Sequence, residues 1–144
     1  MKDFVETRII TAVRKLLIGR VNEILDEAQF VVPLIELEGY EGGSVVIPEL
    51  SLVSCERTDK ERIIRLDAYS LTIVFSLPET RESELYCYAY AAAVQKALCE
   101  NPTLGGIADR AVVTLKKYSP PKKPHCGEGW ELTVALRITV EAEQ

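Results

Sequence analysis

The only histidine of the chain, His125, directly precedes Cys126. A thiolate beside an imidazole can act as a nucleophile. Neighbours in sequence rarely direct their side chains toward each other, however, and no third group that would orient the imidazole stands out. The segment from Ser119 to Gly129 contains three prolines and two glycines, so we expect a solvated loop here.

The four cysteines, Cys55, Cys87, Cys99 and Cys126, are far apart and form no C-x-x-C pair. One histidine cannot complete a zinc site of two cysteines and two histidines. Three cysteines with the histidine, or all four cysteines, would require distant segments to converge without the usual closely spaced pairs. We therefore expect ordinary reduced thiols in a reducing compartment, with no metal site and no disulfide framework.

Gly105 and Gly106 follow a predicted helix and precede a predicted strand, which is the reverse of a phosphate-binding loop. The G-x-G-x-x-G and Walker A spacings are also absent. A turn that needs positive φ explains these two glycines better.

Charged clusters are the remaining candidates for chemistry. Paired carboxylates act as acid and base only in a shielded cleft that separates their pKa values. The acidic clusters fall in a predicted loop and at a helix start, and a small basic patch surrounds the proline-rich loop, so solvated charge is the simpler interpretation. The residues are Glu36, Glu38, Glu41, Glu79, Glu82 and Glu84, with Lys116, Lys117, Lys122 and Lys123 in the basic patch. We predict no catalytic, cofactor-binding or metal-binding residues.

Length and charge limit the class of protein. The chain has 144 residues, 17 basic and 22 acidic, for a net charge of −5. We expect one α+β domain over residues 1–144, since 47% apolar residues can form a core. The acidic balance argues against a dedicated nucleic-acid-binding protein. No apolar run approaches the roughly 20 residues that span a bilayer, and the first residues do not read as a signal peptide, so we expect a soluble protein made inside the cell.

The first half predicts a helix, an arm and a hairpin. Apolar residues recur at helical spacing from Phe4 to Asp26, although Gly19 weakens the interior of this helix. An extended arm or loop lies around residues 30–48 and is interrupted by Pro33. Residues 50–57 and 63–77 are expected to form the two strands of a hairpin, and the second of them alternates with a period of two.

The second half predicts a helix and another hairpin. Thr80 or Ser83 can cap a helix that runs to about Glu100. Residues 111–118 form a strand with Ala111, Val113 and Leu115 on one face, and residues 130–141 alternate more cleanly than any other segment.

The order helix, arm, hairpin, helix, hairpin predicts an α+β fold. We expect a mainly antiparallel sheet of about four or five strands with two helices packed on one face. Such a sheet has an open face and exposed edges, and these favour assembly with a partner.

The second half resembles a known family. The segment AYAAAVQKALCENPTLGGIADRAVVTLKKYSPP (Ala89 to Pro121), followed by WELTVALRITVEA, is similar to the tail terminator, or tail completion, proteins of long-tailed bacteriophages and prophages, also called minor tail or head–tail joining proteins. The opening at Ile9 to Leu17 and the strand LDAYSLTIVFSLP also fit the family, and the Leu-Gly-Gly turn is the most specific part.

The resemblance implies a structural protein of the virion tail that is made in the bacterial cytoplasm. Family members form a ring, typically a hexamer, on the end of the tail tube, where the ring stops tube growth and joins the head connector or head-completion protein. No cofactor, catalysis or membrane partner is expected. DNA would only pass through the lumen, and an acidic lumen would keep it from sticking.

Extended, exposed backbone can pair with or wrap a neighbouring subunit. We therefore take the arm, the turn after the first hairpin strand and the proline-rich loop as candidate oligomer interfaces. Their residues are Pro33, Tyr40, Pro48, Thr58, Asp59, Lys60, Pro121, Lys122 and Lys123.

Two alternatives remain open. The first is another phage tail or head-completion protein, such as a tube protein whose stacking arm would be residues 30–48. The second is a small ligand-binding or enzymatic α+β domain with a pocket beside the tyrosine-rich helix, which would hold Tyr86, Tyr90 and a titratable group with a shifted pKa.

Overall fold

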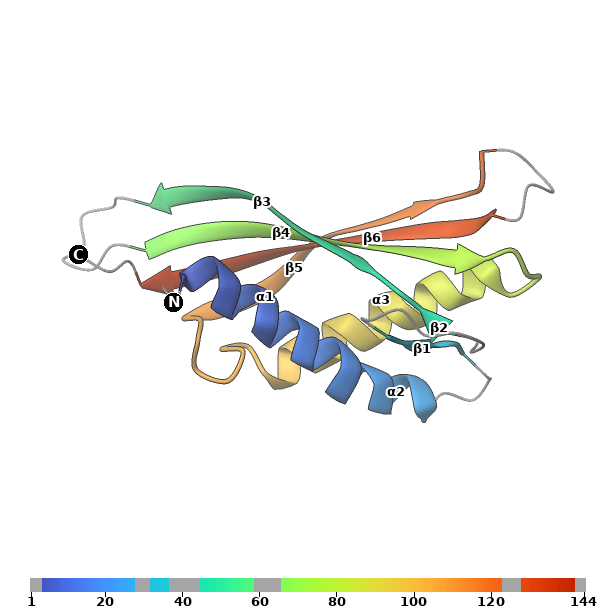
Figure 1. The fold of residues 1–144 in the computed structure, drawn as a ribbon, viewed down its shortest axis with the longest axis horizontal. Helices are drawn as coiled ribbons and strands as arrows, with labels where there is room; N and C mark the ends of the chain where they lie inside the picture. The colour runs from blue at the N-terminus through green and yellow to red at the C-terminus, as the bar shows by residue number, and fades with distance from the viewer. Residues whose placement is uncertain (1–3, 28–31, 37–44, 59–65, 123–127, 142–144) are drawn as a thin grey trace.

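The computed structural model describes residues 4–27, 32–36, 45–58, 66–122 and 128–141 and has the expected α+β architecture. Four antiparallel strands form one sheet in the order β3-β4-β6-β5 (Figure 1). Their bounds are β3 Glu49–Thr58, β4 Leu66–Pro78, β5 Arg110–Ser119 and β6 Glu128–Glu141. The helical segments are α1 Val5–Leu16, η1 Leu17–Val21, α2 Asn22–Asp26 and α3 Ser83–Glu100. Two short parallel strands, β1 Leu34–Ile35 and β2 Val45–Val46, form a separate pair.

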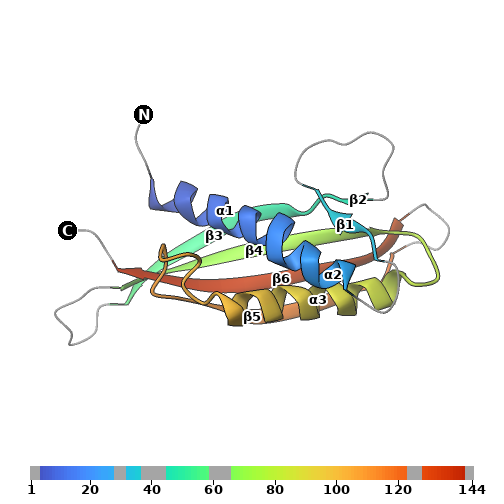
Figure 2. The same ribbon diagram turned by 90° about the horizontal axis from the view of Figure 1, so that it is seen from below.

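Period-two alternation in the central strands creates the core. In β4 the odd-numbered residues from Tyr69 to Leu77 are buried, and in β6 the even-numbered residues from Leu132 to Ile138 are at most 1% exposed. All the helices lie against this face (Figure 2), which we call the helix-facing side. The opposite side, which we call the open face, carries no helix in the described part of the chain.

The N-terminal helix runs without a break from α1 through η1 to α2, with helical backbone at each junction. Gly19 lies in η1, a π-helical turn, so the weakness that the sequence predicts coincides with an irregular turn rather than with a helix end. The next residue after η1, Asn22, binds the arm. Its Nδ2 donates to the Ile35 carbonyl at 2.8 Å, and its Oδ1 accepts from the Ile35 N–H at 2.7 Å.

Tyr90 on α3 also holds the described part of the arm. Its ring is fully buried and stacks on Phe75 with the ring centres 5.2 Å apart, and its hydroxyl donates to the Pro33 carbonyl. Burial raises the pKa of Tyr90, so the hydroxyl keeps its proton and remains a donor. Two side chains thus fix the backbone of the arm near residues 33–35 to the helical layer.

Two local predictions are wrong. Neither Thr80 nor Ser83 caps α3, because its N-cap is Glu82 and no side chain caps it. Ser83 is buried in the first turn, and its Oγ accepts a hydrogen bond from the Trp130 N–H at 2.8 Å, which ties α3 to β6. Leu115 does not share a face with Val113, because a bulge between these two residues turns Leu115 to the open face, where it is 51% exposed.

Candidate functional site

The described members of the predicted interface set are mostly held against the body of the protein. Pro33 is half-buried and bonded to Tyr90, Pro48 is buried, and Pro121 is half-buried, whereas Lys122 is exposed. The backbone of Thr58 ends β3 in pairing with Leu66. The rest of the set, Tyr40, Asp59, Lys60 and Lys123, lies outside the described residues. Their part in assembly stays a prediction.

The predicted turn at Gly105 and Gly106 is confirmed. Both glycines have positive φ, as does the preceding Leu104 at 51°. The Gly105 N–H donates to the Asn101 Oδ1 at 3.1 Å, and the Gly106 N–H donates to the Thr103 carbonyl at 3.1 Å. The amides of this turn therefore stabilise the end of α3.

The cysteines differ in exposure. His125 and Cys126 lie outside the described residues. Cys87 is fully buried, and burial raises the pKa of its thiol to about 11, which makes it a poor nucleophile. Cys55 on β3 and Cys99 on α3 are exposed.

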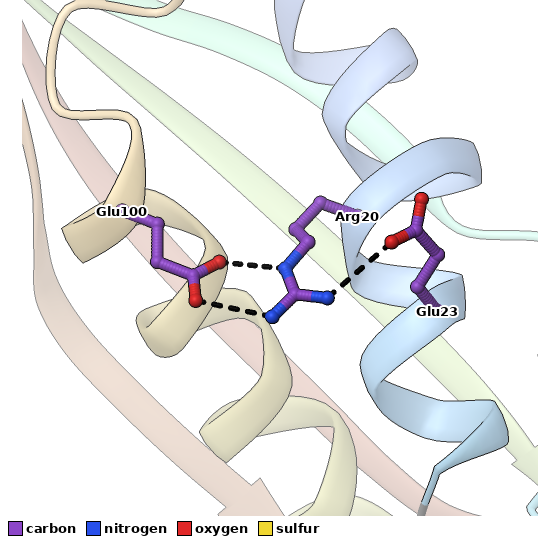
Figure 3. Close-up of polar contacts among 3 residues, drawn as sticks. All are labelled: Arg20, Glu23 and Glu100. Atoms are coloured by element: carbon purple, nitrogen blue, oxygen red, sulfur yellow. Dashed lines mark hydrogen bonds and ion pairs between the residues drawn. The ribbon is translucent and has the colours of Figure 1, made fainter.

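One cavity of about 350 Å³ lies between the N-terminal helix and the turn after α3. Lys15 and Arg20 are its basic lining residues. Arg20 is held by Glu100, with Nε–Oε1 and Nη2–Oε2 distances of 2.6 and 3.1 Å, and it also contacts Glu23 at 3.3 Å (Figure 3). The hydrogen bond from Arg20 lowers the pKa of Glu100. This ion pair locks η1 to the end of α3 and leaves Arg20 occupied.

The open face carries mostly small side chains where it crosses the two central strands. Of the seven that follow, Ala68 is buried and the other six are half-buried by their neighbours. They are Ala68, Ser70, Thr72 and Val74 on β4 with Thr133, Ala135 and Thr139 on β6. A face of this kind lets another surface approach closely.

The sheet ends in two strands whose outer sides pair with no other described strand, β3 and β5. Residues that pair across all four strands form transverse rows, each of which begins on β3 and ends on β5. One row, for example, is Leu52, Leu71, Leu136 and Val113. The seven complete rows have these ends: Glu49/Lys117, Leu50/Lys116, Ser51/Leu115, Leu52/Val113, Ser54/Val112, Cys55/Ala111 and Glu56/Arg110.

The outermost rows carry opposite charges at their two ends. Glu49 and Glu56 on β3 are exposed on the open face, and Lys117 and Arg110 end the same rows on β5. Bulges in β3 between Leu52 and Ser54, and in β5 after Val113, create this match. In regular strands, seven residues of separation would place Glu49 and Glu56 on opposite faces of the sheet, and Arg110 and Lys117 likewise.

A groove accompanies the β5 edge. A second cavity of about 350 Å³ lies between the end of α3 and β5, and most of its lining is apolar. Leu98, Ala111 and Val113 form its floor, and Cys99 and Gln95 line it from α3. The groove is therefore next to the backbone groups of β5 that have no strand partner among the described residues.

Other functional features are sparse in the described chain. Neither cavity is lined by Tyr86 or Tyr90. The described residues include no group of three or more His, Cys, Asp or Glu side chains placed to hold a metal ion. Of the helices in the structure, none is long and apolar enough to cross a membrane. A scan against protein-family models finds no match, and a search of curated proteins finds no significant relative.

The sequence did not assign Glu49, Glu56 or Arg110 to an interface, and it placed Lys117 only in a basic patch. The alternation of each strand was visible, but the bulges that set which side chains share a face were not. Charge was the available signal, because residues 110–119 contain three basic and no acidic residues.

Proposed function

We propose that the protein is a tail terminator, or tail completion protein, of a long-tailed bacteriophage or prophage, and that it acts by forming a closed ring of identical subunits. The observation that carries the proposal is the match between the two edges of the sheet. A heterologous contact needs two different, complementary surfaces on each subunit. Repetition of this contact forms a ring when the successive rotations return to the first subunit. The β3 and β5 edges meet this requirement, because they carry opposite charges and these charges lie on the same face of the sheet.

Strand direction supports a head-to-tail ring. The four strands alternate in direction, so β3 and β5 run opposite to each other. A copy rotated about an axis roughly along the strands places its β3 antiparallel to β5 of the first copy. The backbone ladder then continues without a break.

A two-fold dimer through β5 is less favourable. It would bring the three basic residues of one β5 against the same three residues of another, and like charges on facing strands destabilise pairing. The head-to-tail contact instead joins β5 to a strand with two exposed acidic side chains, Glu49 and Glu56.

In this proposal the ring sits on the end of the tail tube, stops the addition of tube subunits and offers its other surface to the head connector or head-completion protein. DNA passes through the lumen. The described open face carries four acidic and three basic side chains, so a lumen lined by this face would be only slightly acidic. They are Glu49, Glu56, Glu131, Glu141, Arg110, Lys117 and Arg137.

Sedimentation velocity across a wide concentration range tests the ring. We expect either one discrete species in solution whose mass is a multiple of 16.1 kDa, or co-sedimentation of the protein with added tail tubes. A protein that stays monomeric in both conditions would remove the proposal.

A further inference from the structure

The groove between α3 and β5 lies beside an edge to which the proposed ring would bring a second copy of the chain. We propose that this groove receives the helix-facing side of β3 from the next copy, with the transverse rows of the two sheets in register. The inference rests on the proposed ring and names the surface that builds it.

The register follows from the rows. If a copy continues the sheet without stagger, each row end on β5 meets the row start on the neighbouring β3. Val113 then lies opposite the neighbour's Leu52, and Ala111 lies opposite the neighbour's Cys55. All four side chains are on the helix-facing side, so the neighbour's Leu52 and Cys55 point into the layer that the groove occupies.

Charge fixes the same register at both ends of the edge. Arg110 meets the neighbour's Glu56, and Lys117 meets the neighbour's Glu49. A shift by two residues along the strand would preserve the facing of the side chains but would separate both pairs. The complementary charges therefore favour the copy in register over a shifted one.

Apolar surface extends beyond the ladder in the same direction. Tyr118 on β5 packs edge-on against Tyr88 of α3, with the ring centres 5.3 Å apart, and both rings are partly exposed. The residues just before β3 in a neighbouring copy continue toward these rings, and among them Ile47 is 48% exposed. Burial of this surface adds a hydrophobic contribution to the charged edge.

The groove contains a native reporter. Cys99 lines it from α3, and in register the neighbour's Cys55 lies above it, opposite Ala111. Both thiols are exposed in the isolated subunit, whereas Cys87 is buried. A short-span bismaleimide should therefore join Cys99 of one copy to Cys55 of the next.

The experiment uses the full chain with Cys126→Ser, at a concentration where sedimentation shows the assembly. We expect a denaturing gel to show a ladder of dimers, trimers and higher species, and peptide mapping to find Cys55 joined to Cys99. Cys55→Ser and Cys99→Ser should each abolish the ladder, because a head-to-tail link needs both thiols.

Two results would overturn the groove assignment while leaving the ring intact. One is an assembled protein that gives no Cys55–Cys99 link. The other is a dimer that persists in one of the single variants, which would indicate a two-fold contact. A protein that sediments as a monomer with and without tail tubes would instead refute the ring, and the groove proposal would fail with it.

Discussion

Charge reversal at the sheet edges gives the sharpest test of the proposed register. The two predicted ion pairs between copies are Lys117 with Glu49 and Arg110 with Glu56. Each pair is exposed at the rim, where an ion pair contributes about 0.2–1 kcal/mol. Reversal of one partner replaces this attraction with a repulsion of similar size. We therefore expect a loss of about 0.5–2 kcal/mol per interface, or roughly 2- to 30-fold in the dissociation constant.

The spacing of the pairs supplies the control. Six row steps separate the row of Glu49 from the row of Glu56, which is roughly 20 Å along the strand. Exposed charges are screened over about 8–10 Å at ordinary salt, so the two pairs act independently. Lys117→Glu should therefore be rescued by Glu49→Lys but not by Glu56→Arg.

Sedimentation equilibrium at low and high salt measures these effects. The single variants should weaken association at low salt, the matched double variants should restore it, and high salt should reduce all the differences. Equal rescue by matched and mismatched partners would refute the register. Single variants that associate as tightly as the wild type would refute the use of this edge altogether.

Three further predictions concern the stability of the subunit, measured by urea denaturation. Gly129→Ala should destabilise the subunit by about 1–3 kcal/mol, because the added Cβ would lie 2.2 Å from a backbone carbonyl oxygen. Gly19→Ala should stabilise it by about 0.5–1 kcal/mol, because the added Cβ would enter open space. Equal effects of the two substitutions would contradict this packing. Tyr90→Phe should cost about 1 kcal/mol, because the Pro33 carbonyl of the arm would lose the hydrogen bond from the Tyr90 hydroxyl. Tyr88→Phe, at an exposed ring, is the control and should stay close to the wild type. A Tyr90→Phe variant as stable as the wild type would show that the arm is not held there. The hydrogen bond from the Arg20 guanidinium lowers the pKa of Glu100, so the ion pair stabilises the folded subunit above pH 4.5 and this stabilisation is lost as the pH falls through the lowered pKa. Glu100→Gln should therefore lose less stability than the wild type in acid. Identical acid denaturation curves would count against the ion pair.

The class of fold and its layers could be predicted from alternation and helical spacing. The even-numbered residues of β6 point to the core because that strand is regular from Leu132 to Ile138, so a period of two is enough to assign its face. The turn at Gly105 and Gly106 was also predictable, because glycine adopts positive φ at little cost whatever the tertiary surroundings.

Features that depend on tertiary contacts could not be predicted. A single bulge after Val113 reverses the facing of Leu115 and Lys117, and nothing in the local sequence marks it. Ser83 is a residue type that commonly caps helices, but its hydroxyl oxygen instead accepts a hydrogen bond from the N–H of Trp130, 47 residues away. The candidate interface depends on both bulges, which is why the edge charges acquire meaning only in the folded sheet.

The most direct test of the central claim is growth of the tail tube. Tail-tube subunits of a long-tailed phage would be assembled with and without the protein, and negative-stain microscopy would give tube lengths and the appearance of tube ends. The account predicts a ring at the tube end and an arrest of elongation, both lost in Lys117→Glu and restored in the matched double variant with Glu49→Lys. Tubes that elongate equally in its presence, with bare ends, would contradict the account.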